Sequence, residues 1–386
     1  MSLGYADLPL HYGHVPRWLA ELMKKLAKAI LEVMVIEYGT TKVLERLSNP
    51  LWFQAFNNAI GMDWDSSGST TVTTAIIKEV LRNSDLGIVV AGGKGKVSLR
   101  TPEEVATYGE KLGLSATKIS ELTNISRLTA KIDTVLLQDG FALYHHALVF
   151  SDKGEWVVIQ QGMNTESRIA RRYHIAWFKI TPNDLSEEPH TGVASDTVVK
   201  PLNLTDKVSR ECKKVIIDLL NEPPKKIYGL LHEVNRLIKG VRTLVGTELV
   251  RPIDRSIPYY RPVRLTHTLL TKLMRAYELK PKDIKEALLV RNLGPEVFRA
   301  LSLVSELIYR EPPSLRDPTT EPYDPFKYAF TVGGKDGIPF PVKRELMIKV
   351  ISELRDVIES AKLGKREKLL ALKSLSKYAP KDLGVH

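Results

Sequence analysis

Two hydrophobic runs, FALYHHALVF at 141–150 and EWVVIQQ at 155–161, constrain the fold of this chain more than any other feature. They are rich in β-branched and aromatic residues and are separated by Ser-Asp-Lys-Gly, which indicates a β-hairpin. Both faces of both strands are largely apolar, as expected of strands that are covered on both sides of a sheet. Helical patterns precede them, and the last of these helices is expected to run from about Ser120 to Gln138 with a polar stripe along one face. The first part of the chain is therefore predicted to be an α+β or α/β domain with a small mixed sheet.

The hairpin also carries polar residues that a catalytic site would use. If residues 151–154 form the loop, His145 lies opposite Gln160. Side chains alternate between the faces of a strand, so His145 and His146 point to opposite faces and do not easily bind one metal. A hydrogen-bonded core residue is the simpler interpretation of each histidine, and a catalytic role is the alternative.

The second part of the chain is predicted to be helical. Further strands are expected at 86–93 and 174–180, but from Thr205 onward only helical patterns occur. A polar stretch at 190–204 marks the boundary. We therefore predict an α/β catalytic domain over 1–200 and an all-α nucleic-acid-binding domain over 201–386.

A helix break within the sequence VRNLGPEVFRAL suggests a role for the helical part. Gly294 is expected to end one helix in the left-handed conformation, and Pro295 to begin the next. The turn resembles a helix-hairpin-helix element, whose free N–H groups at the second helix can bind phosphate. A simple packing turn is the alternative.

Composition favours a polyanionic partner. The net charge is +11 and the pI is about 9.4, which suits nucleic acid, although a basic but otherwise inert surface would give the same values. No apolar run is long enough to span a membrane and no signal peptide is apparent, so a cytoplasmic location is expected. Cys212 is the single cysteine and only four glutamines occur. Scarcity of such thermolabile residues suggests a thermophilic source.

Several basic segments are candidates for contact with a nucleic-acid backbone. Glycine-rich AGGKGK and GGKDG resemble phosphate-binding loops, and Arg168 and its neighbours have the spacing of one helix face. RPIDRSIPYYRPVR interleaves arginine with tyrosines that could stack on bases. An extended linker that is pinned by packing of its tyrosines is the alternative for this segment. The candidate phosphate-binding residues are Lys94, Lys96, Arg168, Arg171, Arg172, Arg261, Arg264, Arg291, Gly294 and Lys335.

Candidate catalytic residues gather around the hairpin. An aspartate before it, a glutamine at its far end and a lysine on the preceding helix loosely resemble a restriction-endonuclease-like site, although no E-x-K motif follows. The candidate catalytic residues are Asp139, Gln161, Lys131, His145 and His146. A divalent metal, Mg²⁺ or Mn²⁺, is expected on Asp139 or on Asp63, which precedes a cluster of hydroxyl side chains.

The order of motifs along the whole chain resembles a prokaryotic family of unknown function, numbered 763. The motifs that carry this resemblance are GYADLPLH, PLWFQAF, DWDSSGSTT, AGGKGK, QDGFALYHH, WVVIQQGMN, ARRYH, EEPH, LGPEVFRALSLVSELIY and FTVGGKDGIPFPV. The resemblance supplies no established activity. Asp65 stands where a histidine is expected, which weakens a metal role for that position.

Taken together, these features favour a DNA-binding, metal-dependent nuclease that serves DNA repair. The expected partners are DNA, single-stranded or structured, and a second copy of the chain in a homodimer. Two other interpretations stay open: a non-enzymatic nucleic-acid-binding module, and an enzyme that acts on a small phosphorylated substrate.

Overall fold

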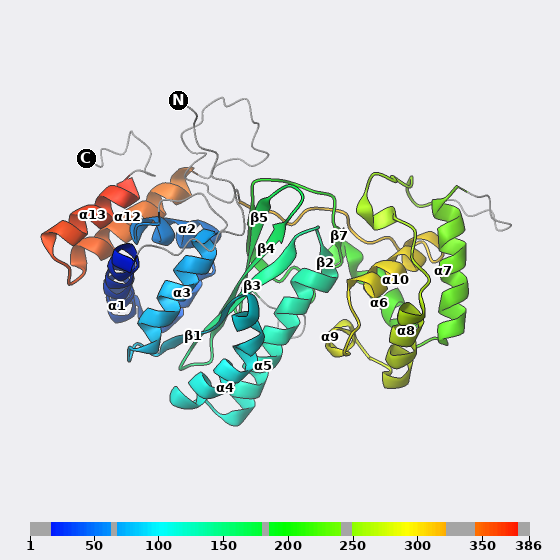
Figure 1. Cartoon of the computed structure of the whole chain (residues 1–386), viewed down its shortest axis with the longest axis horizontal. Helices are drawn as coiled ribbons and strands as arrows, with labels where there is room; N and C mark the ends of the chain where they lie inside the picture. The colour runs from blue at the N-terminus through cyan, green and yellow to red at the C-terminus, as the bar shows by residue number, and fades with distance from the viewer. Residues whose placement is uncertain (1–16, 63–67, 180–184, 241–248, 322–343, 377–386) are drawn as a thin grey trace.

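A five-stranded antiparallel sheet forms the centre of the protein (Figure 1). The computed structural model describes residues 17–62, 68–179, 185–240, 249–321 and 344–376. The strands are β1 (Ile88–Lys94), β3 (Ala142–Ser151), β4 (Trp156–Asn164), β5 (Ile169–Ala176) and β6 (His190–Ser195), and they pair in that spatial order. Two short strands, β2 (Leu137–Gln138) and β7 (Leu202–Asn203), form a separate pair.

Helices cover both faces of this sheet. One face, called here the α3 face, packs against α1 (Arg17–Leu47), α2 (Pro50–Ala59) and α3 (Gly68–Arg82). The opposite face, called the α5 face, packs against α4 (Thr101–Lys111) and α5 (Ala116–Lys131). Figure 1 shows the two helical layers on either side of the strands. The N-terminal part is thus a three-layer arrangement with the sheet in the middle.

The alternating side chains of β4 explain why the sheet needs two covering layers. Val157 and Ile159 lie in the core of the α3 face, whereas Trp156 and Val158 lie in the core of the α5 face. Each buried aliphatic side chain contributes roughly 1.5–3 kcal/mol, so both faces favour a helical cover. The prediction of strands that are buried on both sides is confirmed.

The hairpin of β3 and β4 forms where it was predicted, but its register is shifted by one residue. His145 lies opposite Gln161, and His146 lies opposite Gln160. The shift arises because Ser151 belongs to β3 and its N–H bonds the carbonyl of Glu155, which moves the turn one residue along the chain. The two histidines point to opposite faces, as predicted.

The arginine-rich segment after the hairpin is a strand and not the predicted helix. Arg171 and Arg172 are successive residues of β5, so they lie on opposite faces of the sheet, and Arg168 precedes the strand with a φ of +58°. The sequence of Ile169–Ala176, IARRYHIA, does not alternate between apolar and polar residues. Pairing with β4 on one side and β6 on the other fixes it as a strand. A shared helix face for the three arginines is therefore wrong.

The helix that leads into the hairpin is shorter than expected. A helix to Gln138 was predicted, but α5 ends at Lys131 and continues as a π-helical turn over Ile132–Leu136 before β2. Such turns widen the helix by one residue and are frequent near functional sites. This π-helical turn places the Asp133 side chain in the interior, against the α5 face of the sheet, where it accepts a hydrogen bond from Gln160.

The elements described after Thr205 are helical, as predicted. They are α6 (Arg210–Leu220), α7 (Pro224–Ile238), α8 (His267–Leu279), α9 (Ile284–Leu289), α10 (Pro295–Leu307), α12 (Arg344–Ser360) and α13 (Lys365–Ser376). The last two do not stay with the others, because they pack against α1 and α2 (Figure 1). A domain boundary at residue 200 stays a prediction. By sequence α12 and α13 belong to the second predicted domain, but they pack against helices of the first.

The turn between α9 and α10 differs in detail from the expected one. Asn292 takes the left-handed conformation, with a φ of +68°, whereas Gly294 is extended and serves as the N-cap of α10. Asparagine tolerates this conformation better than most residues, which explains why the glycine is not needed for it. The N–H groups of Val297 and Phe298 bond the Gly294 carbonyl. The helix-hairpin-helix element is not confirmed.

Candidate active site

Two rows of polar side chains cross the sheet at the same level, one on each face. On the α5 face, His146, Gln160 and Tyr173 lie side by side on β3, β4 and β5. Polar residues buried in a sheet need hydrogen-bond partners, so both rows require explanation.

The row on the α5 face forms a continuous chain of hydrogen bonds. Gln160 Nε2 donates to Asp133 Oδ2 over 2.5 Å, which leaves Oε1 as the acceptor for His146 Nδ1 at 2.8 Å. His146 Nε2 is then the acceptor for the Ser126 hydroxyl at 2.8 Å. Burial lowers the pKa of His146, which is consistent with a neutral ring in this tautomer. Each of these hydrogen bonds therefore fixes which atom is the donor and which is the acceptor in the next one.

The chain ends at a histidine beside a cavity. Asp133 Oδ1 lies 2.6 Å from His190 Nε2, and the carboxylate is fully buried. The side chain of His190 is 7 % exposed and lines a cavity of about 300 Å³. An aspartate bound to one ring nitrogen holds the other nitrogen, Nδ1, as a proton acceptor. No residue in the described part of the chain bonds that nitrogen.

The cavity contains cations and hydroxyl groups as well as His190. The exposed side chains of Lys179 and Arg316 lie on its wall, and Thr319 and Thr320 add hydroxyl groups. The other lining residues are Glu188, Asn203, Thr205, Asp206, Asp317 and Pro318. An imidazole that shares a cavity with two cations is an arrangement that can remove a proton while it stabilises negative charge on a substrate.

A buried ionic cluster connects this cavity to the sheet. Arg171 donates to Asp139 at 3.0 Å and to Asp317 at 2.9 Å, and Tyr173 donates to the same oxygen of Asp139 at 2.8 Å. The other Asp139 oxygen accepts from the Phe141 N–H at 3.1 Å. Burial raises the pKa of Asp139, and the neighbouring guanidinium of Arg171 opposes that rise. Asp139 thus holds the Arg171 guanidinium and the backbone just before β3 in place.

The row on the α3 face is built differently. His145, Gln161 and Arg172 lie side by side on β3, β4 and β5, and His145 Nε2 lies 3.1 Å from the Thr74 hydroxyl. His174, two residues further along β5 on the same face, donates from Nδ1 to the Leu47 carbonyl at 3.0 Å. Within the described residues, His145 Nδ1 and His174 Nε2 are buried with no hydrogen-bond partner. Burial lowers the pKa of His145 to about 3 and holds the pKa of His174 well below its usual value. Both rings are therefore neutral at physiological pH.

Arg172 crosses the same α3 face and reaches three neutral oxygens. Its guanidinium donates to Gln54 Oε1, the Thr70 hydroxyl and the Pro50 carbonyl, at 3.2–3.3 Å. It also stacks over the ring of Phe53, 4.8 Å from the centroid. A cation held on an aromatic ring and on neutral dipoles is a stabilising arrangement inside a protein.

The structure does not bring the predicted catalytic residues together. Asp139 and Gln161 lie on opposite faces of the sheet, and Lys131 is a half-buried residue at the end of α5. His145 and His146 also face opposite layers. The proposed combination of aspartate, glutamine and lysine in one site is therefore not found, because the register directs each side chain separately.

The predicted metal site is only partly covered by the structure. Asp63, together with Asp65, lies outside the described residues. In the part of the chain that is described, no group of three or more His, Cys, Asp or Glu side chains is placed to hold a metal ion. Metal binding by Asp139 or Asp63 stays a prediction.

The predicted phosphate loops have mixed outcomes. Lys94 and Lys96 are exposed, but the glycine before them has a structural reason: a Cβ at Gly92 would lie 2.3 Å from the His146 carbonyl oxygen and 2.5 Å from Thr101 Oγ1. The glycine is needed for close packing. Lys335 and its GGKDG loop lie outside the described residues.

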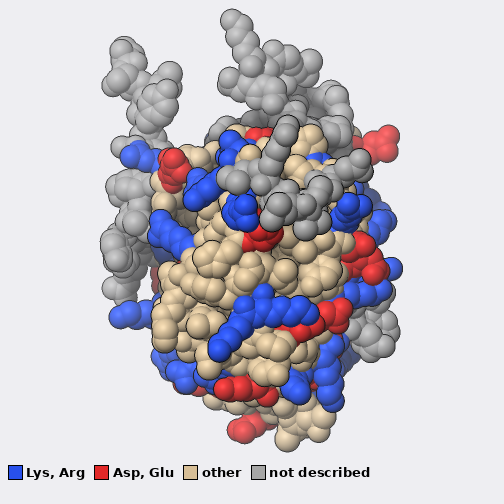
Figure 2. All heavy atoms as spheres, turned by 90° about the vertical axis from the view of Figure 1, so that its right-hand side faces the viewer, with Lys and Arg blue, Asp and Glu red and all other residues tan. Residues whose placement is uncertain are grey.

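The arginine-tyrosine segment does not present its aromatic rings to solvent. Tyr259 and Tyr260 are buried, so the expected stacking on bases is wrong for both. Their packing against the helical core agrees with the alternative of a pinned linker. Arg261 and Arg264 are exposed, as is Arg291 before α10. Figure 2 shows this end of the molecule, where Lys and Arg are interspersed with Asp and Glu around a broad area that carries neither.

The residues that sequence reasoning missed are Asp133, His190 and the two cations of the cavity. Asp133 follows Ile132 in KIDTVLL and falls outside the polar stripe of its helix, which was a usable signal of burial. His190 follows two glutamates and a proline in EEPH and resembles a loop residue. Only the fold reveals that these two residues meet across 57 positions of sequence.

Comparison with known proteins identifies the family but no activity. A family model described as "Protein of unknown function (DUF763)" matches residues 4–342. The chain belongs to this family. The resemblance predicted from the motifs is thereby confirmed. No significant match was found among curated proteins or among solved structures. No helix in the described part of the chain has the length and apolar character needed to cross a membrane.

Proposed function

We propose that the protein hydrolyses phosphodiester bonds of nucleic acid, with His190 as the general base. One observation carries this proposal: the imidazole of His190 is bound to the buried Asp133 at 2.6 Å and lines a cavity together with Lys179 and Arg316. The net charge of +11 supports a polyanionic substrate. The proposal keeps the nuclease predicted from the sequence and places its chemistry at a different site.

The roles of the residues follow from their chemistry. Water attacks phosphorus, and its proton passes to His190 Nδ1 as the bond to the leaving oxygen breaks. Asp133 then faces a positively charged imidazolium and stabilises it. Lys179 and Arg316 stabilise the negative charge that develops on the phosphoryl oxygens in the transition state. The leaving oxygen takes a proton from solvent. A divalent metal remains a separate part of the prediction.

The size of the cavity favours a second candidate. Its volume of about 300 Å³ is at the lower limit of sites that hold small molecules, so a small phosphate ester is an alternative substrate. In that case the protein would cleave a phosphomonoester or a nucleotide and would not cleave a polynucleotide.

The proposal is tested by cleavage of end-labelled single-stranded, flap and bubble DNA and of RNA, with p-nitrophenyl phosphate esters as small substrates. Each assay is run with Mg²⁺, with Mn²⁺ and with EDTA. General-base catalysis contributes roughly 10²–10⁴-fold, so His190→Asn is expected to reduce cleavage by that factor. His232→Asn, at an exposed position on α7, is the matched control and should leave cleavage unchanged. Cleavage by His190→Asn at the wild-type rate would refute the proposed base.

A further inference from the structure

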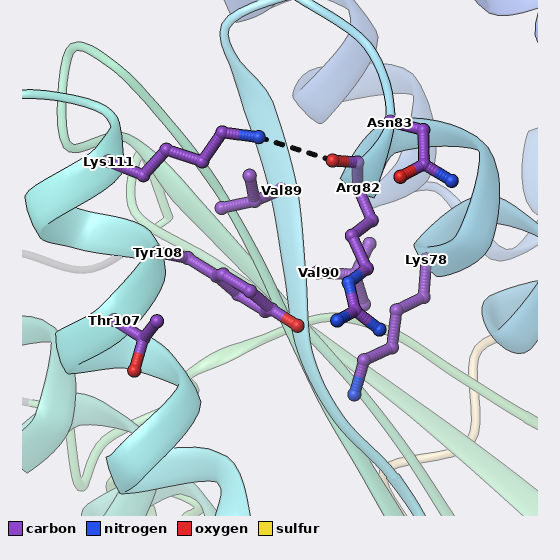
Figure 3. A pocket seen from close by; sticks show the side chains of 8 residues that line it. All are labelled: Lys78, Arg82, Asn83, Val89, Val90, Thr107, Tyr108 and Lys111. Atoms are coloured by element: carbon purple, nitrogen blue, oxygen red, sulfur yellow. Dashed lines mark hydrogen bonds between the residues drawn. The ribbon is translucent and has the colours of Figure 1, made fainter.

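A cleft at the free edge of β1 is separate from the cavity of His190. β1 is at one end of the sheet and β6 is at the other, so four strand spacings, about 19 Å, separate the two edges. The cleft has a volume of about 300 Å³ and lies between α3 and α4 (Figure 3). Its lining residues are Lys78, Arg82, Asn83, Val89, Val90, Thr107, Tyr108 and Lys111.

Side chains from both helices close the strand edge at one end of the cleft. Gly92 donates its N–H to Glu104 at 2.7 Å, and its carbonyl accepts from Lys78 at 2.8 Å. The carbonyl of Gly87 points the other way, toward β3, and accepts from the backbone N–H of Asp152 in the turn after β3. Since backbone groups alternate along a strand, those of Val90 point outward, into the cleft. The edge thus offers a backbone N–H in addition to side-chain donors.

The cations of the cleft are only partly neutralised. Lys78 pairs with Glu104 at 2.6 Å, and this same carboxylate oxygen also accepts the N–H of Gly92. Lys111 donates to the backbone carbonyl of Arg82 at 3.2 Å, not to an acid. Among the described residues, no carboxylate pairs with the guanidinium of Arg82 or with the amine of Lys111. Two positive charges therefore remain for a ligand.

Figure 3 shows how these groups converge. The Tyr108 hydroxyl from α4 and the Arg82 guanidinium and Lys78 amine from α3 point into the same space above β1. Donors from two helices and a strand edge surround one volume. Planar guanidinium and point-like ammonium groups together with a phenol hydroxyl suit the tetrahedral oxygens of a phosphate.

The cleft continues into two hollows along α3 and α1. The first shares Lys78, Arg82 and Asn83 with it, and the second is lined by Lys24, Lys25 and Lys28. The lysines of the second hollow all have acidic partners: Lys24 pairs with Glu21 and Glu79, Lys25 pairs with Glu367, and Lys28 lies 3.7 Å from Glu32. A row of basic side chains thus leads from the cleft across the outside of α3. A chain of phosphates that follows this row would replace the carboxylates of these weak surface ion pairs.

We propose that this cleft binds a phosphate group, and that the adjoining hollows extend it into a track for the phosphate backbone of a nucleic-acid strand. The proposal does not depend on the chemistry of His190, because it concerns binding at the opposite edge of the sheet. The track is a second site of contact with the nucleic-acid strand. Its role of holding the part of the strand that is not cleaved rests on the proposed nuclease function.

The test measures binding without turnover. The full chain carrying His190→Asn is titrated with a fluorescein-labelled 20-nucleotide single strand, and anisotropy is recorded over a series of salt concentrations. Adding Arg82→Gln and Lys111→Gln is expected to weaken binding about tenfold at low salt. The slope of log K against log salt should fall by about 0.7 for each phosphate that the protein no longer neutralises. Lys225→Gln with Arg275→Gln, exposed on α7 and α8, removes the same charge and should have a much smaller effect.

Two further measurements distinguish the source of the phosphate. A strand of the same sequence with a neutral methylphosphonate backbone should not bind. Line broadening of inorganic phosphate in ³¹P spectra should occur with the protein and be reduced in the cleft variant. Broadening without strand binding would restrict the site to small phosphates and reject the track. Unchanged strand and phosphate binding in the cleft variant would overturn the proposal, whatever the outcome of the His190 assay.

Discussion

The two faces of one sheet contain similar residues but treat them in opposite ways. Next to each other on β3 and β4 stand two histidines and two glutamines, and alternation sends one of each to either face. On the α5 face, His146 has a partner on both ring nitrogens and belongs to a chain that reaches a cavity. On the α3 face, the ring of His145 has one partner, Thr74, and a buried Nδ1 without a partner in the described chain.

This difference shows how the covering layer determines the role of a buried histidine. The π-helical turn after α5 supplies Asp133, a carboxylate that reaches both Gln160 and His190. The α3 face has hydroxyl and amide groups at the same level, and no carboxylate is bonded to His145 or His174 among the described residues. A carboxylate partner stabilises the charged ring that forms when a histidine accepts a proton, whereas neutral partners and burial hold the ring uncharged. We therefore expect chemistry from the α5 face and a contribution to stability from the α3 face.

The largest expected effect is on catalysis by the α5 face. Asp133→Asn should lower cleavage about 10²-fold or more, because the amide no longer stabilises the imidazolium and can fix the wrong tautomer. Thr74→Val, which removes the partner of His145 on the other face, should leave cleavage unchanged. Rates are measured across pH 5–9, with circular dichroism to confirm folding. A changed pH profile in a folded Asp133→Asn protein would support a positioning role, and equal activity in both variants would reject the distinction between the faces.

Much of the fold could be predicted from the sequence because it depends on local patterns. The hairpin of β3 and β4 and the helices after Thr205 follow from periodicity and turn residues. The strand β5 could not, because its arginines resemble a solvated helix face. Their burial becomes favourable only when Asp139, Asp317 and Gln54 arrive from other parts of the chain.

The site was less predictable than the fold, for a physical reason. Sequence reasoning selected residues close together in the chain, such as Asp139, His145 and His146. The pairing of Asp133 with His190 depends on a π-helical turn and on the position of β6, neither of which leaves a local pattern. The register shift by one residue changed which partner each histidine faces, as any such slip does in a strand.

The next largest effect concerns stability on the α5 face. Arg171→Met should lower the free energy of unfolding by about 3–5 kcal/mol, because it leaves the carboxylates of Asp139 and Asp317 buried without their cation. Arg168→Met, at an exposed position three residues earlier, should change it by less than about 0.5 kcal/mol. Urea denaturation measures both. Similar losses in the two variants would contradict the role of Arg171 as the centre of this cluster.

On the α3 face, acid should act through His145. The pKa of His145 is lowered to about 3 in the folded chain, so the unfolded chain binds a proton that the folded chain does not once the pH falls below about 6.5. Stability should therefore be present above that pH and be lost on acidification, by about 1.4 kcal/mol per pH unit for this residue until the pH nears the folded pKa. Denaturation between pH 7 and pH 4 measures the slope. His145→Gln should reduce it, and an unaltered slope would show that other groups dominate.

The smallest effect compares the two hydroxyl groups that hold the paired histidines. Ser126→Ala and Thr74→Val each remove a partner from a buried ring, so each should lower the free energy of unfolding by about 1–3 kcal/mol. Only Ser126 is part of the chain that leads through His146 and Gln160 to Asp133. Loss of its hydroxyl lets His146 turn, which relaxes the Gln160 amide and the carboxylate beyond it. Ser126→Ala should accordingly lower cleavage about threefold to tenfold and Thr74→Val should not, since coupling of this size is ordinary within one hydrogen-bond network. If both variants lose stability and neither loses activity, the bond between Asp133 and His190 is sufficient by itself, and the rest of the α5 row serves the fold alone.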